Sequence, residues 1–219
     1  MIIGIVGLIG SGKGTVGDIL VQDYGWVAES FAKPLKDAVA TIFDWPRHLL
    51  EGDTKESREW RENVDSWWSE ALGWEVTPRL ILQKMGTEAG RNVFGKPLWT
   101  SALIKRLSAR KNYVITDVRF VNEIEALKGC GGHVIRVRRG PEPDWFPVAQ
   151  EFLKTEPHIG SVEIPENGRW VTETLAKLPH RSEWDWVNSQ FDSVIYNDGS
   201  LDDLKKAVHS TIGLMYMGR

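Results

Sequence analysis

The first 15 residues, MIIGIVGLIGSGKGT, constrain the fold of this chain more than any other stretch. An apolar run is followed by three glycines, Gly7, Gly10 and Gly12, and then by Lys13. Glycines let backbone N–H groups turn inward around an anion, and a helix from about Lys13 to Asp23 aims its N-terminal dipole at the same anion. This order of strand, glycines, lysine and helix predicts a phosphate-binding loop.

One position departs from the common P-loop pattern, which places Ser or Thr directly after the lysine. Here Gly14 follows Lys13, and the hydroxyl comes one residue later at Thr15. This variant, GxxGxGKGT, is the form found in nucleoside monophosphate kinases. The residues expected to bind nucleotide phosphates are Gly10, Ser11, Gly12, Lys13, Gly14 and Thr15. The alternative is a glycine-rich turn that binds no ligand.

The composition predicts a compact intracellular enzyme. With 219 residues, 42% of them hydrophobic, the chain can bury a full core as one α/β domain that carries insertions. A net charge of −3 gives no sign of a nucleic-acid-binding face. The single cysteine, Cys130, excludes an intramolecular disulfide framework and suits a reducing cytosol, and we assign it no catalytic role.

No apolar run approaches the ~20 residues of a membrane span. The short N-terminal apolar run lacks a basic leader and leads directly into the phosphate loop. We therefore expect a soluble, unprocessed, cytoplasmic protein that binds neither membranes nor nucleic acid.

Apolar runs suited to buried strands recur after the first one. They lie at Trp26 to Phe31, Asn112 to Thr116, His133 to Val137 and Ser193 to Tyr196. Helical patterns separate them, at Pro34 to Phe43, Pro78 to Val93, Leu98 to Ala109, Val121 to Lys128 and Leu201 to Ile212. Alternating strands and helices predict an α/β three-layer sandwich, with five mostly parallel strands and ligands at their carboxyl ends.

Two stretches interrupt this alternation and are predicted to be insertions over the active face. Trp45 to Thr77 is charged and rich in tryptophan, and Gly140 to Trp186 carries many prolines and acids. The second lies where a lid that excludes water is expected, although a surface subdomain without function is the alternative. In the first, tryptophans among charges favour an amphipathic helix packed on the core, while a base pocket or a dimer contact stay open.

A second motif, YVITDVRFVNE, covers Tyr113 to Glu123. A strand that ends near Asp117 has the form of a Walker B element, whose carboxylate holds Mg²⁺ through water or binds a substrate hydroxyl. Arg119, two residues on, can reach a phosphate. The alternative makes Asp117 the N-cap of the following helix, with Arg119 as its surface partner.

With these motifs in place, the chain resembles the phage-type deoxynucleoside monophosphate kinases, a branch of the P-loop kinases that is also related to dephospho-coenzyme A kinases. The resemblance covers nearly all of 1–219, as one P-loop kinase domain. Besides the phosphate loop it rests on FAKPLK from Phe31, TPR from Thr77, LQ at 82–83, GTE from Gly86, Arg91, LW at 98–99, TDVRF from Thr116, NE at 122–123, GGHVIRVRR from Gly131, HRSE from His180 and NDG from Asn197.

The resemblance implies transfer of the γ-phosphoryl group of ATP to a deoxynucleoside 5′-monophosphate. Lys13 would hold the β and γ phosphates, Thr15 and Asp117 would serve Mg²⁺ directly or through water, and Arg119 would clamp the acceptor or the transferring group. An acceptor phosphate is already an anionic nucleophile, so the reaction needs no general base. The motif set, rich in arginine and poor in bases, agrees with that.

The acceptor is expected to bind within 31–110. At helical spacing Arg79, Gln83, Thr87 and Arg91 fall near one face, which can offer guanidinium groups to a phosphate and an amide to a base edge. A solvated helix face is the alternative. The resemblance adds Phe31, Lys36 and Glu123 as substrate-binding residues; the alternatives are a strand-end core residue for Phe31 and a helix-surface lysine for Lys36. Trp99 could stack on a base or belong to the core.

The predicted lid covers 139–190, next to three arginines. Strand alternation sends Arg136 and Arg138 to the same face, which is unusual in a buried strand unless they meet phosphate or a carboxylate. We expect Arg136 to bind the cofactor, and Arg138 or Arg139 to stabilise the transition state. His180 and Glu183 match the H-x-S-E pattern of the family, and a helical pair or a cap at Ser182 is the alternative.

The turn at Asn197, Asp198 and Gly199 follows the last strand and is expected near the adenine, with Ser200 as the N-cap of the next helix. Two other functions stay open: a dephospho-coenzyme A or other small-metabolite kinase that uses Asp117 as a base, and a nucleotide-dependent switch. A homodimer is plausible from the family, and the accepted base is undetermined.

Overall fold

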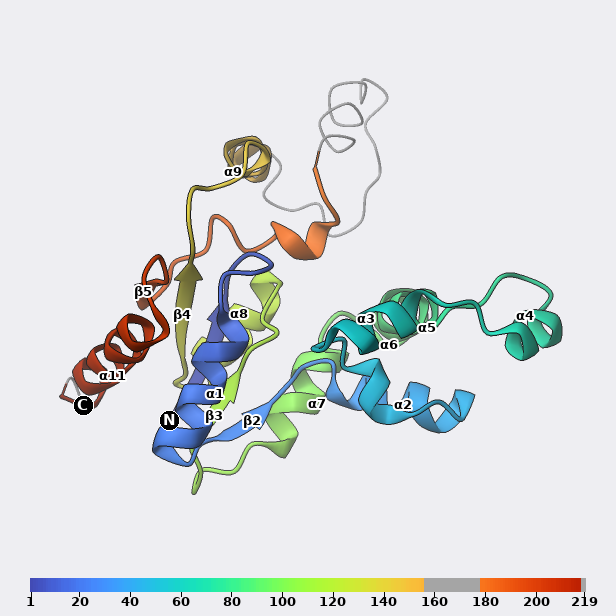
Figure 1. Cartoon of the computed structure of the whole chain (residues 1–219), viewed down its shortest axis with the longest axis horizontal. Helices are drawn as coiled ribbons and strands as arrows, with labels where there is room; N and C mark the ends of the chain where they lie inside the picture. The colour runs from blue at the N-terminus through green and yellow to red at the C-terminus, as the bar shows by residue number, and fades with distance from the viewer. Residues whose placement is uncertain (156–177, 218–219) are drawn as a thin grey trace. The chain divides into compact units, whose positions relative to one another are not determined.

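The structure, a computed structural model, describes residues 1–155 and 178–217 (Figure 1). The chain forms two compact units: unit 1 comprises Met1–Ala28 and Ser108–Arg219, and unit 2 comprises Glu29–Leu107. The acceptor region predicted at 31–110 overlaps unit 2. The middle of the predicted lid, 156–177, lies outside the described residues.

Unit 1 is built around a five-stranded sheet in the order β2-β3-β1-β4-β5. The strands are β1 (Ile2–Val6), β2 (Val27–Glu29), β3 (Tyr113–Ile115), β4 (His133–Arg138) and β5 (Ser193–Tyr196). β1 pairs in parallel with β3 and β4, and β4 pairs in parallel with β5. The predicted set of five mostly parallel strands is therefore confirmed, because buried parallel strands give the continuous apolar runs seen in the sequence.

Helices cover both faces of this sheet. On one face, α1 (Lys13–Tyr24) and α11 (Leu201–Met217) bury Ile3 and Ile5 of β1 in one apolar cluster. On the other face lies α8 (Val121–Gly129), whose Leu127 packs so closely on Gly4 that a Cβ there would be 2.5 Å from its Cδ1. The predicted three-layer α/β sandwich is confirmed (Figure 1).

Unit 2 is helical. It contains α2 (Lys33–Phe43), η1 (Arg47–Leu50), α3 (Lys55–Glu62), α4 (Ser66–Leu72), α5 (Pro78–Gln83), η2 (Lys84–Arg91), α6 (Asn92–Phe94) and α7 (Leu98–Arg106). Its own core joins Leu35, Val39, Phe43, Trp45, Leu50, Val76 and Ile81. This cluster and the one around β1 lie in different units, which agrees with each unit being compact by itself.

The tryptophan-rich insertion does not form the single amphipathic helix expected from its sequence. It folds into η1, α3 and α4, since Thr54 and Asp65 each cap a new helix by accepting a hydrogen bond from its backbone. The prediction that its tryptophans pack on a core is confirmed for Trp45, which is buried, and for Trp68, whose Nε1 donates to the Phe43 carbonyl at 3.0 Å. Trp67, by contrast, is exposed.

The predicted single helix from Pro78 to Val93 is wrong in its middle. The α-helix ends at Gln83, and η2 is a π-helix that continues to Arg91. Trp99 causes the change locally: its Nε1 donates to the Gly86 carbonyl at 2.8 Å, and a Cβ on Gly90 would lie 2.6 Å from its ring. Gln83 ends the α-helical part and Arg91 ends the π-helix, and a common face for Arg79, Gln83 and Arg91 stays a prediction.

The excursion between β4 and β5 contains α9 (Trp145–Thr155) and the short η3 (Arg181–Glu183) among its described residues. Other predicted helices are confirmed within a few residues, although α11 continues five residues past Ile212, to Met217. No helix in 1–155 or 178–217 combines the length and the apolar character needed to cross a membrane.

Candidate functional site

The phosphate loop connects β1 to α1 with a backbone that only glycine tolerates. Gly10 and Gly12 have φ of 79° and 99°, which L side chains rarely adopt. Space is short as well: a Cβ on Gly7 would lie 2.3 Å from the Val137 carbonyl oxygen, and one on Gly12 would lie 2.4 Å from Nδ2 of Asn197. The loop is thus pressed against the ends of β4 and β5.

Asn197 holds the loop in place. Its buried Nδ2 donates to the Ser11 carbonyl at 2.9 Å, across 186 residues of chain. In the structure this side chain contacts the phosphate loop, and the predicted place of Asn197 near the adenine stays a prediction. Through this hydrogen bond the turn after the last strand fixes the position of the loop at the start of the chain.

Lys13 begins α1 and bends back over the loop. Its Nζ donates to the carbonyls of Gly7 at 2.7 Å and Leu8 at 2.8 Å. Its pKa is lowered from 10.5 to about 8, mainly by burial and next by the charge of Arg119, while the charge of Glu183 opposes both. A site whose two cations disfavour each other in this way gains most from an anion that both can approach.

Ser11 provides an independent sign of a missing ligand. Its Oγ is buried and has no hydrogen-bond partner among the described residues. A buried hydroxyl without a partner costs free energy, so an acceptor or donor supplied by a ligand would satisfy it. On its outer side the loop is open, since a Cβ on Gly10 or Gly14 would meet nothing within 4 Å.

Asp117 lies two residues beyond β3 and is half-buried. It is not the N-cap of α8, because that position belongs to Phe120. The structure therefore contradicts the capping alternative and leaves the Mg²⁺ role as a prediction. Thr15 lies half-buried in the first turn of α1. Among the described residues no three His, Cys, Asp or Glu side chains form a metal site, so Mg²⁺ here would depend on phosphate oxygens as well.

Arg119 connects this loop to the far end of the chain. Its Nη1 donates to Glu183 Oε1 at 2.5 Å and lies 3.5 Å from Ser182 Oγ. Ser182 in turn shares a 2.9 Å hydrogen bond with His180 Nδ1. The predicted residues Arg119, His180 and Glu183 are thus brought together. The side chains of His180 and Glu183 contact different partners, while the Glu183 N–H donates to the His180 carbonyl at 2.9 Å.

Glu123 has a structural role that its assignment as a substrate ligand did not foresee. Its buried carboxylate accepts hydrogen bonds from the backbone N–H groups of Arg119 at 2.8 Å and Phe120 at 3.1 Å. These bonds satisfy free donors at the start of α8 and fix the backbone that carries Arg119. Substrate binding by Glu123 stays a prediction.

The two arginines predicted to share a face of β4 do meet a carboxylate. Glu142, from the stretch after β4, pairs with Arg136 and lies 3.2 Å from Arg138 Nε. Asp198 lies near the same turn, where its Oδ1 accepts a hydrogen bond from the Gly140 N–H at 2.6 Å.

Ser200 is confirmed as the N-cap of α11. Its Oγ accepts from the Asp203 N–H at 3.2 Å, and the Asp203 carboxylate accepts from the Ser200 N–H at 3.0 Å. The Ser200 hydroxyl also donates to the Asp203 carboxylate at 2.6 Å, and this bond, together with the one from the Ser200 N–H, lowers the pKa of Asp203. Gly199 leaves room for this arrangement, because a Cβ there would lie 2.8 Å from Asp203 Oδ2.

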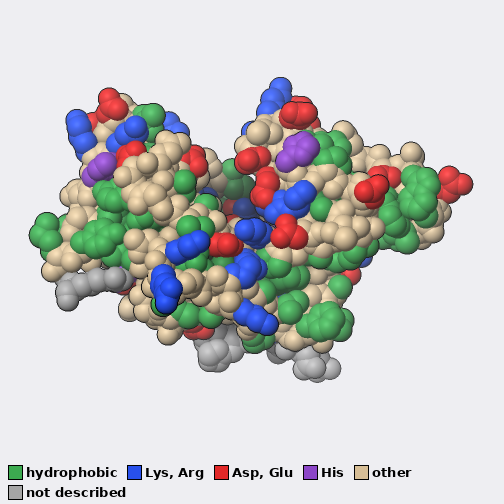
Figure 2. Space-filling model, turned by 90° about the horizontal axis from the view of Figure 1, so that it is seen from below, with side chains coloured by type: hydrophobic (Ala, Val, Ile, Leu, Met, Phe, Trp, Pro, Cys, Tyr) green, Lys and Arg blue, Asp and Glu red, His purple; other side chains and the backbone are tan. Residues whose placement is uncertain are grey.

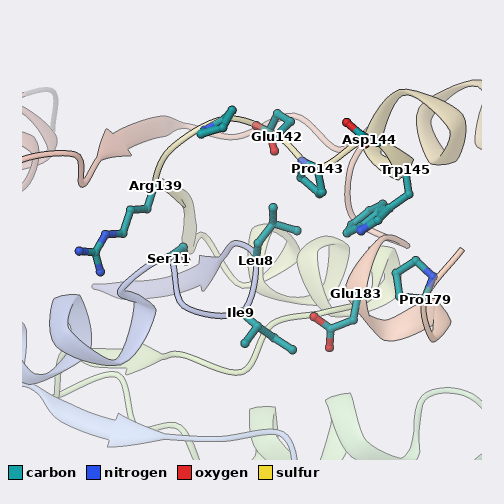
Figure 3. A pocket seen from close by; sticks show the side chains of 11 residues that line it. Leu8, Ile9, Ser11, Arg139, Glu142, Pro143, Asp144, Trp145, Pro179 and Glu183 are labelled. Atoms are coloured by element: carbon teal, nitrogen blue, oxygen red, sulfur yellow. The ribbon is translucent and has the colours of Figure 1, made fainter.

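A hollow of about 690 Å³ lies over the phosphate loop (Figure 3). It is lined by Leu8, Ile9, Ser11, Arg139, Pro141, Glu142, Pro143, Asp144, Trp145, Pro179 and Glu183. In Figure 3, Leu8 of the loop lies opposite Pro143 and Trp145. Sequence reasoning found Ser11, Arg139 and Glu183 but missed Glu142 and Trp145, whose only signal is the run GPEPDW directly after β4.

The predicted acceptor residues lie in unit 2 and are described within it. Lys36 pairs with Glu51 at 2.6 Å, while Arg79 pairs with Glu62 at 2.8 Å, so these two cations have separate partners. Phe31 is buried, as its core alternative predicted, and Trp99 packs on η2. Gln83 ends α5, and Arg91 ends η2.

The charge on the surface is mixed. On the face shown in Figure 2, Lys and Arg side chains are interspersed with Asp and Glu side chains. This agrees with the small net charge of −3.

No family model matches the chain. A protein of Acanthamoeba polyphaga mimivirus, named "Putative deoxynucleotide monophosphate kinase", is 32% identical to it over 153 residues, which are 64% of this chain and 74% of that protein. A salivary alpha-glucosidase of Anopheles gambiae is 28% identical over 153 residues, or 65% of this chain, but the chain spans only 24% of that protein.

Among solved structures, shikimate kinase from Aquifex aeolicus aligns over 100% of both chains, with a TM-score of 0.43 and 10% identity. At this score and identity the likeness carries no assignment of substrate.

Proposed function

The chain belongs to the deoxynucleotide monophosphate kinase family and is a phosphotransferase, and from this premise we propose that it transfers the γ-phosphoryl group of ATP to a deoxynucleoside 5′-monophosphate. The products are ADP and the deoxynucleoside diphosphate. Atoms and charge balance without a general base, because an oxygen of the acceptor phosphate attacks the γ-phosphorus while the bond to the β-phosphate oxygen breaks.

The observation that carries this proposal is the glycine-rich loop over which Lys13 is held, with the charge of Arg119 nearby. Burial and the nearby Arg119 together depress the pKa of Lys13 to about 8. Two cations that repel each other at a glycine-rich loop are suited to a ligand with several negative charges, as in a triphosphate facing an acceptor phosphate. A neutral sugar or metabolite hydroxyl would leave part of that positive charge without a partner.

Each residue near the loop then has a defined task. Lys13 binds the β and γ phosphates, the Ser11 hydroxyl and the loop N–H groups fill the remaining acceptors, and Arg119 exchanges Glu183 for phosphate oxygens. Thr15 and Asp117 would hold Mg²⁺, which would neutralise the negative charge that develops during transfer. Arg138 and Arg139, next to the hollow, add positive charge during transfer.

We assign the acceptor to unit 2, as the resemblance implies. Lys36, Arg79 and Arg91 offer cations for a monophosphate, and Gln83 offers an amide for a base edge. Phe31 and Trp99 are assigned to the shape of the pocket, because the first is buried and the second is bound to Gly86. The accepted base is left to experiment.

The test is a coupled ADP-release assay with ATP and Mg²⁺ against dAMP, dCMP, dGMP, dTMP, the four ribonucleotides and dephospho-coenzyme A. We expect turnover with one or more deoxynucleoside monophosphates, and chromatography should find the matching diphosphate. Lys13→Met is the negative control, and Lys206→Met, at an exposed lysine on α11, is the matched control. Turnover of dephospho-coenzyme A alone, or ATP hydrolysis unaffected by any acceptor, would overturn the proposal.

A further inference from the structure

Arg136 has surroundings unlike those of a phosphate ligand. It lies on β4 between Val6 of β1 and Val194 of β5, and only 15% of its side chain is exposed. Its guanidinium lies over the rings of Phe146 at 4.9 Å, Trp186 at 5.2 Å and Phe191 at 6.0 Å. Cation–π interactions with three aromatic rings stabilise the guanidinium in this position.

These rings come from both legs of the excursion between β4 and β5. Phe146 belongs to α9 on the outgoing leg, while Trp186 and Phe191 belong to the leg that returns to β5. They also contact one another, with centroids 6.1 Å apart for Phe146 and Trp186 and for Trp186 and Phe191. Arg136 therefore joins the two legs to the sheet.

Glu142 is shared between Arg136 and a second arginine. Its carboxylate pairs with Arg136 and, at 3.2 Å, with Nε of Arg138, and it lines the hollow over the phosphate loop. Arg138 is the more accessible of the two, with 36% of its side chain exposed and a ring contact to Tyr196, which is itself exposed. An entering triphosphate has to compete with Glu142 for Arg138.

We infer that Arg136 is a positioning residue: it neutralises Glu142 and thereby leaves Arg138 available to nucleotide phosphates. In this role Arg136 contacts Glu142 and not the phosphates, in contrast to the cofactor-binding role expected from the sequence. The inference rests on the proposed function only in taking ATP as the ligand. A carboxylate held by two arginines gives up one of them to an anion more readily than a carboxylate with one partner does.

Removal of Arg136 should therefore strengthen the hold of Glu142 on Arg138. In Arg136→Met the carboxylate has one cation left, so we expect the Kd for ATP to rise about tenfold. The melting temperature should fall by several degrees, because the aromatic cluster loses its central side chain. If Arg136→Met does not fold, Arg136→Lys serves instead, since lysine keeps the charge but lacks the planar fork that serves carboxylate and rings together.

The decisive variant is the double substitution Arg136→Met with Glu142→Gln, measured by calorimetric titration with ATP and by thermal unfolding. We expect it to restore the Kd to within about threefold of the parent and to recover part of the melting temperature, because the unpaired carboxylate is gone. Glu142→Gln alone should bind ATP slightly more tightly. Arg138→Met should weaken ATP binding, and Glu142→Gln should not rescue it, because the phosphate ligand itself is lost.

Two results would overturn the inference. If the double variant binds ATP as weakly as Arg136→Met does, Arg136 contacts the nucleotide directly. If Arg136→Met changes neither the Kd for ATP nor the melting temperature, Arg136 has no positioning role. Failure of the proposed function is a separate outcome, since these readouts require no acceptor, and the unfolding measurements stay informative even if the parent protein does not bind ATP.

Discussion

In both the phosphate loop of unit 1 and the π-helix of unit 2, a side chain packs against a glycine and donates to a backbone carbonyl, but the backbones differ. In the loop, Asn197 donates to the Ser11 carbonyl and crowds Gly12; in the π-helix, Trp99 donates to the Gly86 carbonyl and crowds Gly90. In both regions a glycine lets a distant side chain reach a backbone carbonyl. The comparison shows that close contact between a side chain and a glycine is not by itself a sign of a ligand-binding loop.

The difference lies in the backbone. Gly12 has a φ of 99°, so a side chain there would be strained by the backbone conformation and would also clash with Asn197. In η2 no residue has a positive φ, so a side chain at Gly90 would clash with Trp99 without that backbone strain. The loop glycines are predicted to turn N–H groups toward a phosphate, while Gly90 of η2 gives room to the indole ring of Trp99. Four experiments test this distinction, from the largest expected effect to the smallest.

Lys13→Met should have the largest effect, because it removes the cation that the loop is built to carry. We expect kcat to fall about 10³-fold, the size typical of losing a charge that stabilises the transferred phosphoryl group. Steady-state kinetics with the best acceptor measures this. Equal activity of Lys13→Met and the parent protein would mean that the loop does not serve catalysis.

Gly12→Ala should be next, because it combines strained φ with a Cβ placed 2.4 Å from Asn197 Nδ2. We expect a loss of about 3 kcal/mol in unfolding free energy together with weaker ATP binding, since the loop has to rearrange. Gly14→Ala is the matched control: it lies in the first turn of α1, and its Cβ would meet nothing within 4 Å. Equal destabilisation by both substitutions would remove the distinction.

Gly90→Ala should destabilise unit 2 while leaving ATP binding intact. The new Cβ would lie 2.6 Å from Trp99 Cζ2, and overpacking of this kind costs about 2 kcal/mol. Urea unfolding and calorimetric ATP titration separate the two effects. Gly86→Ala is the milder comparison, because its Cβ would meet only the end of the Leu35 side chain at 3.0 Å. A loss of ATP affinity in Gly90→Ala would contradict this expectation.

The pH dependence of ATP binding should give the smallest effect, and it belongs to the loop alone. The pKa of Lys13 is about 8 in the free protein and rises when phosphate binds, so above pH 8 binding takes up a proton. The Kd should be flat below pH 8 and rise roughly tenfold per pH unit above it. Lys13→Arg should abolish this slope, because arginine stays protonated.

The same pKa has a consequence for stability. It lies below the ordinary value of 10.5, so between pH 8 and 10.5 the unfolded chain binds more protons at this residue than the folded one. The contribution of Lys13 therefore makes the protein more stable as the pH rises through that window. Thermal unfolding of the parent and of Lys13→Met across this range measures it, and identical slopes would contradict the shift.

The sequence predicted unit 1 better than unit 2 for a physical reason. Buried parallel strands and a glycine-rich turn have local patterns, so β1, β3, β4, β5 and the phosphate loop were predicted close to their actual bounds. The π-helix depends on Trp99, which lies several residues beyond it, and its sequence still has helical periodicity. Tertiary packing decided that segment, as it did the division of the tryptophan-rich insertion into short helices.

Within the candidate site the same limit applies. Residue type and order predicted Lys13 and Arg119, and the family resemblance added Glu183. No local pattern indicates that Glu183 pairs with Arg119 or that Asn197 holds the phosphate loop. These contacts join segments 64 and 186 residues apart in the chain. Glu142 was missed because one acid among prolines resembles an ordinary surface turn.

The chain leaves the sheet for unit 2 and returns from unit 2 at neighbouring strands. The chain departs from unit 1 after Ala28 and returns at Ser108, and the Val27 N–H donates to the Asn112 carbonyl at 2.9 Å across that junction. An insertion whose two ends are already joined can change its length or composition without a shift in the strands that support the phosphate loop. The segment 30–107 can therefore be varied as a block, and a library confined to it would test the proposal that this unit binds the acceptor.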